Sequence, residues 1–177
     1  MILKLKRAPG IYLVGFMGCG KSTIGRALAE ELGWSFCDLD EEIERRESTT
    51  ISQIFDARGE AAFREAESAA LRERVQTVIR GHPQVISLGG GAFVGEENFT
   101  LVSEHGVTVW IDCPFTVIER RVAAAAHRPL ARDPAQLRTL FDARRSVYAR
   151  ADYRVEALDD DPRSVVEQIL ALPLFRP

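Results

Sequence analysis

Cysteine is scarce in this sequence, and the few cysteines present do not suggest a structural role. The 177 residues include only three, Cys19, Cys37 and Cys113. They show no metal-ligand spacing, and an odd number of cysteines cannot all pair within one chain. Because disulfides are rare in reducing compartments, we expect three reduced thiols in a cytoplasmic protein.

Long hydrophobic runs and an excess of basic residues are missing as well. No apolar run approaches the roughly 18 residues that are needed to span a bilayer. Residues 1–10, MILKLKRAPG, are basic but lack the apolar centre of a secretory signal. The net charge is −3, whereas nucleic-acid binding calls for clustered lysine and arginine. We therefore expect neither a membrane nor a nucleic acid as a partner.

What the sequence does contain is an alternation of short apolar runs with longer helical patterns. Its length suits one domain, and a hydrophobic content of 46% is enough for a buried core. Strands alternating with helices predict an α/β fold with a mostly parallel sheet covered on both faces. The expected strands are Ile11–Val14, Ser35–Leu39, Val85–Leu88, Val107–Ile111 and Tyr153–Val155. The expected helices run from the first glycine-rich loop to Gly33, over Glu60–Ile79 and Phe115–Ala126, onward from Pro134, and over Pro162–Leu172.

The glycine-rich stretch GFMGCGKST, Gly15–Thr23, lies between an expected strand and an expected helix. It fits the pattern G-x-x-x-x-G-K-[ST] with Gly15, Gly20, Lys21 and Ser22. Glycines allow a tight turn whose N–H groups face an anion, and the helix start adds its positive dipole end. In this pattern the lysine reaches the β- and γ-phosphates and the serine hydroxyl coordinates Mg²⁺. The stretch predicts a bound nucleoside triphosphate with Mg²⁺, and the lack of an Asn-Lys-x-Asp signature favours ATP over GTP.

Polar and glycine residues follow the next two expected strands. Asp38 and Asp40 in FCDLD end the second strand, where open α/β sheets bind ligands. Strand alternation would place both carboxylates on one side, for metal and substrate, although Asp40 could instead cap the helix that begins at EEIERR. Gly89–Gly91 end the third strand, and three missing side chains favour close approach of a ligand over a merely flexible turn.

Arginines supply the positive charge that phosphoryl transfer requires. Arg64 lies in GEAAFRE, Arg128 in HRPL, and Arg144 and Arg145 in ARRSVYARAD. Arg128 belongs to VAAAAHRPLARDPAQ, residues 122–136, which is either a mobile functional insert or an ordinary surface loop.

In this order the motifs resemble those of the shikimate kinase family. The resemblance extends from Ile11 to about Leu172 and rests on GFMGCGKSTIGRALA, FCDLD, GEAAFREAE, ISLGGG, HRPL and ARRSVYARAD. That family is similar in fold to nucleoside monophosphate kinases. The resemblance implies one P-loop kinase domain over residues 1–177, with a five-stranded parallel sheet flanked by helices, a substrate-binding region near 38–66 and a mobile lid near 122–136. It implies a monomer that transfers the ATP γ-phosphate to the 3-hydroxyl of shikimate, on the route to chorismate and the aromatic amino acids.

The resemblance also assigns roles to individual residues. On the ATP side it implies a phosphate loop of Gly15, Gly18, Cys19, Gly20, Lys21, Ser22 and Thr23, with Mg²⁺ on Ser22 and, through water, on Asp38. Arg128 would reach the phosphates as the lid closes, and Arg121, rather than Arg120, would stack on adenine. On the acceptor side it implies Asp40 at the shikimate hydroxyls, as base or orienting group, Arg64 and Arg144 at the carboxylate, and Gly89, Gly90 and Gly91 lining the substrate. Lys21, Asp40 and Arg128 would be the catalytic residues.

Some positions depart from the family pattern or leave a choice open. The lid reads HRPLA where a second leucine is more common, and the preceding AAAA is short and apolar. Arg145 adjoins Arg144, and we choose Arg144 because it lies four residues before Tyr148. We expect Cys19 to be a small filler rather than a catalytic thiol.

Three other functions fit parts of the sequence. A gluconate kinase-like enzyme would share the phosphate loop, but the Arg64–Arg144 pair and the triple glycine favour shikimate. A P-loop ATPase would use VTVWID as its second motif, with Asp112 as the metal-linked acid. A non-catalytic module that senses shikimate would not need Lys21, Asp38, Asp40 and Arg128 together, so we expect catalysis.

Overall fold

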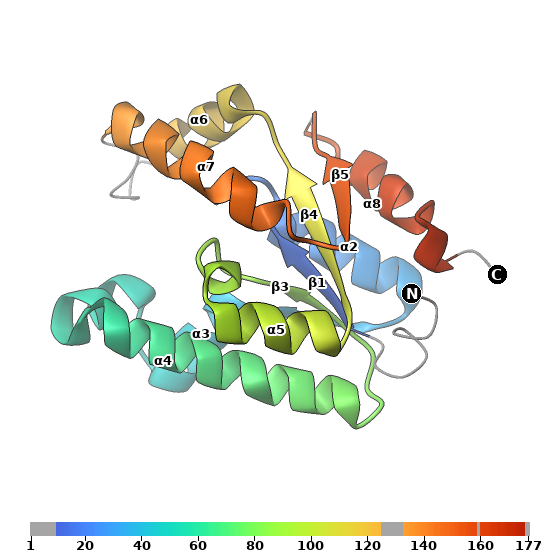
Figure 1. The fold of residues 1–177 in the computed structure, drawn as a ribbon, viewed down its shortest axis with the longest axis horizontal. Helices are drawn as coiled ribbons and strands as arrows, with labels where there is room; N and C mark the ends of the chain where they lie inside the picture. Colours follow the sequence, from blue (N-terminus) through green and yellow to red (C-terminus); the bar gives the residue numbers. More distant parts are fainter. Residues whose placement is uncertain (1–9, 125–132, 159, 176–177) are drawn as a thin grey trace.

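The computed structural model describes residues 10–124, 133–158 and 160–175 (Figure 1). The segment MILKLKRAPG up to residue 9, the HRPL motif with Arg128, and most of the expected lid therefore lie outside the described residues. No helix within the described ranges is both long and apolar enough to cross a membrane.

The centre of the fold is a parallel sheet of five strands in the order β2-β3-β1-β4-β5. Its strands are β1 (Gly10–Val14), β2 (Ser35–Asp38), β3 (Gln84–Ser87), β4 (Val107–Asp112) and β5 (Tyr153–Glu156). All four pairings are parallel, and β1, β3 and β4 are buried along their whole length. The predicted fold class is confirmed, and each expected strand is present within about two residues of its predicted ends.

Helices cover both faces of this sheet, as Figure 1 shows. On one face, α2 packs against β1, β2 and β3 and also against α8, while α4, α5 and α7 lie on the other face. The helices are α2 (Lys21–Leu32), α3 (Leu39–Glu47), α4 (Ile51–Ile79), α5 (Glu96–Glu104), α6 (Phe115–Ala124), α7 (Pro134–Tyr148) and α8 (Pro162–Leu170). Short 3₁₀ turns, η1 (Ala92–Val94) and η3 (Pro173–Phe175), complete the described elements.

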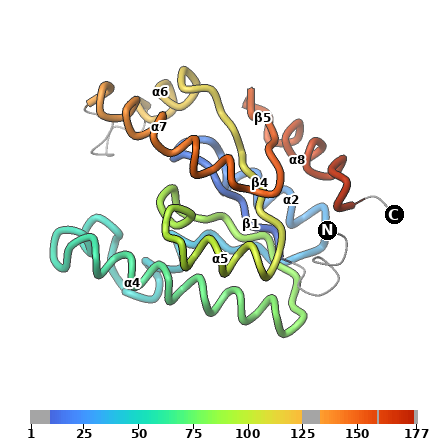
Figure 2. Tube along the Cα trace, in the orientation of Figure 1, coloured from blue at the N-terminus to red at the C-terminus, as the bar shows by residue number. Residues whose placement is uncertain are grey.

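Two glycines decide where long helices begin or end. Gly33 adopts φ 65° at the end of α2, a left-handed conformation that suits glycine and closes the helix as expected. Gly59, with φ 81° and ψ 175°, breaks α4 just before the predicted start at Glu60. Residues 51–58 therefore form a separate helical segment that the periodicity did not reveal, and Figure 2 traces the chain from α3 through this bend into the long segment beside α5.

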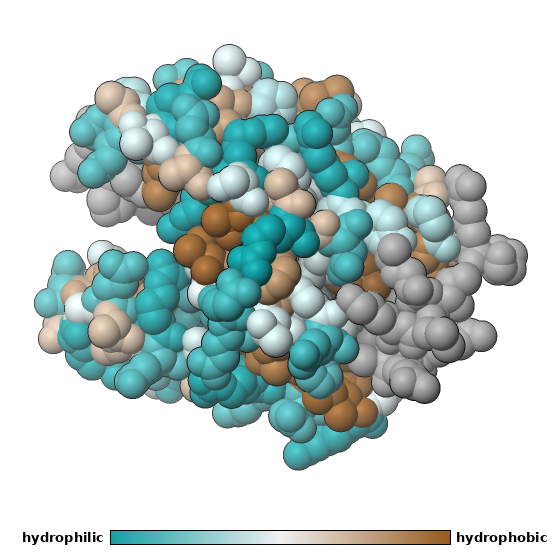
Figure 3. Space-filling model, in the orientation of Figure 1, coloured by the Kyte–Doolittle hydropathy of each residue, from teal (hydrophilic) through white to brown (hydrophobic). Residues whose placement is uncertain are grey.

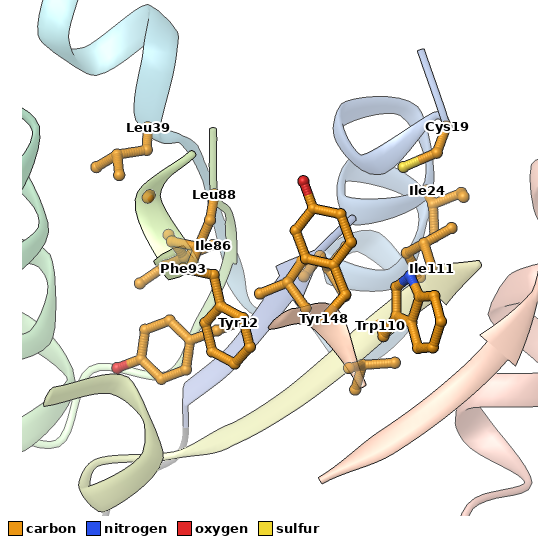
Figure 4. Close-up of a cluster of buried hydrophobic side chains, with 14 of the residues drawn as sticks. Tyr12, Cys19, Ile24, Leu39, Ile86, Leu88, Phe93, Trp110, Ile111 and Tyr148 are labelled. Carbon is orange, nitrogen blue, oxygen red and sulfur yellow. The ribbon is translucent and has the colours of Figure 1, made fainter. Parts of the chain in front are cut away.

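A buried core connects the sheet to both helical layers. Figure 4 shows Tyr12 and Ile86 from the sheet beside Phe93, with Trp110, Ile111 and Tyr148 on the neighbouring side. All of these side chains are at most 6% exposed. Because the core fixes the strands, the loops at their carboxyl ends are held in defined positions around one site.

Candidate active site

A cavity of about 450 Å³ opens at the carboxyl ends of the central strands. Figure 3 shows that the surface is hollowed between the part formed by α6 and α7 and the part formed by α3 and α4. The expected donor-side residues from Gly18 to Thr23 line it together with Asp40 and Gly90, whereas Arg64, Arg144, Gly89 and Gly91 do not. The cavity is lined by Met17, Gly18, Cys19, Gly20, Lys21, Ser22, Thr23, Ile24, Asp38, Asp40, Ser87, Leu88, Gly90, Arg121, Ala157, Asp160, Asp161, Pro162 and Val165.

The loop Gly15–Thr23 joins β1 to α2 and requires glycine at three positions. Gly15, Gly18 and Gly20 have φ values of 148°, 78° and 92°, in the region that L side chains avoid. A Cβ atom at Gly15 would also lie 2.7 Å from the Ile111 carbonyl oxygen. The first turn of α2 begins at Lys21, so its unpaired N–H groups and positive dipole end face the loop.

Lys21 is buried inside this loop. Its Nζ donates to the carbonyl oxygens of Gly15 at 2.8 Å and Phe16 at 3.0 Å, and lies 3.8 Å from Cys19 Sγ. Cys19 is itself only 1% exposed, which agrees with the expected packing role. The ammonium charge is thus fixed at the centre of a glycine-rich concavity that suits an anion.

Ser22 and Asp38 form the oxygen pair expected for the metal. The Ser22 hydroxyl donates to Asp38 Oδ2, and both residues line the cavity next to the phosphate loop. Mg²⁺ prefers oxygen ligands and is usually bound by one or two protein groups together with phosphate oxygens. Ser22 and Asp38 supply such oxygens beside the loop. The residues therefore fit this ion.

The two aspartates differ from the sequence prediction in one respect. Asp38 ends β2, but Asp40 lies in the first turn of α3 rather than on the strand, so strand alternation does not relate them. Asp38 is also the N-cap of α3, because its Oδ1 accepts from the backbone N–H groups of Asp40 at 3.0 Å and Glu41 at 3.2 Å. The interpretation of Asp40 as that cap is wrong, and its side chain faces the cavity instead.

The loop Gly89–Gly91 contacts both Asp40 and Arg64. A Cβ atom at Gly89 would lie 2.6 Å from Asp40 Oδ1, and one at Gly91 would lie 2.5 Å from Arg64 Nη2. Neither glycine has a positive φ, so close approach of these side chains, rather than backbone freedom, requires glycine there. The structure thus places the Asp40 carboxylate and the Arg64 guanidinium against the same glycine segment, which has no side chains of its own.

Arg64 is held by two carboxylates on its own helix. Its Nη1 donates to Glu67 Oε1 at 2.8 Å and its Nη2 to Glu60 Oε1 at 3.4 Å, while its guanidinium lies over the Phe63 ring at 5.1 Å. Glu67 is 1% exposed, and burial raises its pKa above the usual value. Arg64 lowers that pKa and the Asp40 carboxylate raises it further. Sequence reasoning missed Glu67, although the i,i+3 spacing from Arg64 was a visible signal.

Arg144 and Arg145 point to different partners. Arg144 Nη1 donates to the Gly90 carbonyl oxygen, which also accepts from the Tyr148 hydroxyl at 2.6 Å. Arg145 instead forms a two-pronged pair with Asp112, at 2.8 Å and 3.1 Å. The structure therefore places Arg144, and not its neighbour, at the triple-glycine loop.

The ion pairs of Asp112 bear on the ATPase alternative. Arg154 also contacts this carboxylate, at 2.6 Å, and the Asp112 side chain is only 8% exposed. This carboxylate is held between two arginines at the end of β4, and Asp112 is not among the residues that line the cavity beside Ser22. The geometry favours Asp38 as the acid near the phosphate loop.

Arg121 lies at the ATP end of the cavity. Its Nη1 donates to the Gly18 carbonyl oxygen at 3.0 Å, and its Nη2 pairs with Asp160 at 2.7 Å. Arg120 also pairs with Asp160, at 2.9 Å, but its side chain is 63% exposed and does not line the cavity. The sequence did not identify Asp160 and the start of α8 as part of the site, because they carry no motif. They lie beside it because of the order of the strands in the sheet.

Comparison with known proteins agrees with this geometry. The family model described as shikimate kinase matches residues 17–172. A shikimate kinase of Cereibacter sphaeroides is 44% identical over 160 residues, which cover 89% of this chain and 77% of that protein. The crystal structure of an Acinetobacter baumannii shikimate kinase in complex with shikimate has a TM-score of 0.85 and 36% identity, covering 96% of this chain and 95% of that one.

A gluconokinase from Sinorhizobium meliloti shares the fold alone, with a TM-score of 0.60 and 20% identity, covering 93% of this chain and 91% of that one. The family match covers most of this chain, and the two relatives described above with 44% and 36% identity are shikimate kinases. The chain belongs to the shikimate kinase family, whose members are ATP-dependent kinases.

Proposed function

We propose that this chain transfers the γ-phosphate of MgATP to the 3-hydroxyl of shikimate, giving shikimate 3-phosphate and ADP. The observation that carries the proposal is the convergence of Asp40, Arg64 and Arg144 on Gly89–Gly91, next to the phosphate loop. One carboxylate and two guanidinium groups complement a small acid that bears several hydroxyls.

On the donor side, the loop Gly15–Thr23 and the start of α2 bind the triphosphate. Ser22, and Asp38 through water, would hold Mg²⁺, which neutralises phosphate charge when it is bound with ATP. Lys21 lies within the loop and stabilises charge on the transferring group by moving from the Gly15 and Phe16 carbonyls to phosphate oxygens. Arg121 is the group beside the base, and Arg128, outside the described residues, is proposed as the lid cation.

On the acceptor side, Arg64 and Arg144 grip the carboxylate of shikimate while Asp40 accepts from its hydroxyls. Because the transition state of phosphoryl transfer is loose, orienting the nucleophilic hydroxyl matters more than strong base catalysis. The close approach of Asp40 to Gly89, which restricts the positions open to the carboxylate, supports this orienting role.

The experiment measures turnover with shikimate, gluconate and no acceptor, using purified protein and MgATP. We expect ADP formation that depends on shikimate and a phosphate resonance that identifies shikimate 3-phosphate. Folded protein that binds ATP but does not turn over shikimate would refute the proposal.

Arg64→Ala tests the acceptor assignment, with Arg72→Ala as a matched control on the same helix. Arg72 pairs with Glu97 at the surface, where its side chain is 52% exposed, whereas Arg64 lies against Gly91. We expect Arg64→Ala to raise the KM for shikimate by about 10- to 100-fold, because charge-assisted hydrogen bonds are lost, and to leave the KM for ATP nearly unchanged. An equal rise in both constants would contradict the role given to Arg64.

We further propose that residues 1–177 form one P-loop kinase domain, with a substrate-binding region near 38–66 and a lid near 122–136, acting as a cytoplasmic monomer. The free thiols of Cys19, Cys37 and Cys113 support a reducing compartment. Size-exclusion chromatography with light scattering tests the monomer, which a mass of about twice 19.7 kDa would contradict.

A further inference from the structure

Tyr148 occupies a buried position between the core and the loop Gly89–Gly91, the acceptor loop of the proposed function. It is the last residue of α7 and only 2% exposed. Figure 4 shows its ring among buried side chains, with Leu88 and Ile86 on one side and Trp110 and Ile111 on the other. The Trp110 and Tyr148 ring centroids are 6.3 Å apart. The ring is therefore part of the core, and only its hydroxyl reaches the site.

That hydroxyl meets Arg144 at a shared acceptor. The Gly90 carbonyl oxygen accepts from Tyr148 Oη at 2.6 Å and from Arg144 Nη1. The two donors lie four residues apart, one turn along the same helix, so both project toward the loop from one face. Gly90 also lies near the phosphate loop, since a Cβ atom there would be 3.7 Å from the Met17 nitrogen.

We propose that Tyr148 is a positioning residue that aims Arg144 at the acceptor carboxylate by fixing the Gly90 carbonyl on which Arg144 rests. One guanidinium nitrogen of Arg144 donates to the Gly90 carbonyl oxygen, and because the guanidinium is planar and rigid, its remaining N–H groups then point in a defined direction. If the Gly90 peptide could rotate, that direction would vary. The Tyr148 hydroxyl prevents the rotation from a rigid ring that the core holds in place.

The donor role of this hydroxyl persists across the working pH range. Burial raises the pKa of Tyr148 to about 12, and the Arg144 guanidinium counteracts part of this rise. The phenol is therefore protonated at neutral pH and donates to the carbonyl.

The test is Tyr148→Phe, which keeps the ring and removes the hydroxyl. The matched control is Tyr153→Phe, because the buried Tyr153 hydroxyl has no hydrogen-bond partner among the described residues. The inference rests on the proposed function, so both variants are assayed with shikimate and MgATP beside the unmodified enzyme. For Tyr148→Phe we expect the KM for shikimate to rise by about three- to tenfold, as loss of one hydrogen bond implies, with the KM for ATP unchanged. Tyr153→Phe should leave both constants unchanged.

A double variant separates positioning from a general packing effect. In an Arg144→Ala background, Tyr148→Phe should raise the KM for shikimate by less than about twofold, because its effect passes through Arg144. Additive effects of the two substitutions, an equal rise in both KM values, or an unchanged Tyr148→Phe enzyme would each overturn the inference. Absence of shikimate turnover by the unmodified enzyme would instead overturn the proposed function, so the two failures are distinguishable.

Discussion

Adding one methyl group at Gly89 or Gly91 gives a direct test of the acceptor loop. In Gly91→Ala, the new carbon would lie 2.5 Å and 2.6 Å from the two terminal nitrogens of Arg64 and 2.9 Å from Arg64 Cζ. In Gly89→Ala it would lie 2.6 Å from Asp40 Oδ1. Gly95→Ala is the matched control, because Gly95 does not line the cavity and the nearest contacts of an added Cβ atom, at 3.9 Å, are ordinary van der Waals distances. The same methyl group is added at each position, yet the structure predicts different results.

The size of the effect follows from which atoms must move. The clashing group at Gly91 is the end of a flexible arginine side chain, so the fold can accept the methyl group by displacing the guanidinium. Stability should then change little, while the charge-assisted contacts of Arg64 with the acceptor, each about 1.5–3 kcal/mol, are lost or weakened. We expect kcat/KM for shikimate to fall by about 10- to 100-fold in Gly91→Ala. Gly89→Ala should lower kcat as well, because Asp40 is the group proposed to orient the reacting hydroxyl.

Steady-state kinetics with each substrate varied in turn, together with the melting temperature, check these values. The KM for ATP should be the same within about twofold in Gly89→Ala, Gly91→Ala and Gly95→Ala, since the loop Gly15–Thr23 is not displaced. A Gly95→Ala enzyme as defective toward shikimate as Gly91→Ala, or an equal rise of the KM for ATP and for shikimate in Gly91→Ala, would refute this prediction.

Other contacts give further predictions. Glu67→Gln should raise the melting temperature at neutral pH but not near pH 4. The folded-state pKa of Glu67 is raised, so the stability that the protonated side chain contributes is complete at low pH and is lost as pH rises through that pKa. The same variant should raise the KM for shikimate by about tenfold, because the buried partner of Arg64 loses its negative charge, and an unchanged KM would count against the assignment. Asp38→Asn should increase the Mg²⁺ concentration needed for half-maximal activity and also lower stability by about 1 kcal/mol or less, because Asp38 caps α3. Asp112→Asn should affect stability alone, and a Mg²⁺ dependence changed by Asp112→Asn but not by Asp38→Asn would favour the ATPase alternative. Burial raises the pKa of Glu42, but Arg45, Arg46 and Arg74 lower it more, to about 2. The Glu42 carboxylate should therefore stabilise the fold above pH 4.5 and progressively less toward pH 2, so a Glu42→Gln variant should show a flatter acid-denaturation curve.

Much of the site was predictable because its residues lie in local motifs. Gly15, Gly18 and Gly20 need positive φ values in a strand–loop–helix context, and a single sequence is enough to indicate that requirement. The strands could be placed because buried parallel strands are short apolar runs between turn signals. The order of those strands was not visible in any local pattern, and the approach of Asp160 to Arg121 follows from it.

Side-chain direction explains most of the remaining differences. Asp38 and Asp40 appeared equivalent on an extended strand, but the chain turns into α3 at Leu39. Both carboxylates line the cavity, and Asp38 alone also caps the helix. Arg144 and Arg145 are neighbours in sequence, and the helix separates them by about 100°, which leads one to Gly90 and the other to Asp112. Gly89 and Gly91 were predicted to allow close approach of a ligand, and the close approach that the structure shows is that of the Asp40 and Arg64 side chains.

The position of Lys21 has a consequence for the energetics of the nucleotide cycle. Its ammonium is already satisfied by the Gly15 and Phe16 carbonyls, so contact with phosphate is an exchange of partners rather than the formation of new bonds. The net gain is the difference between two sets of charge-assisted interactions, which is smaller than either alone. On the role proposed for Lys21, the same exchange runs in reverse when ADP departs, and the Gly15 and Phe16 carbonyls accept from the ammonium again. The Lys21 contact then adds only part of its strength to nucleotide affinity, and the cost of releasing the product is reduced by the same amount.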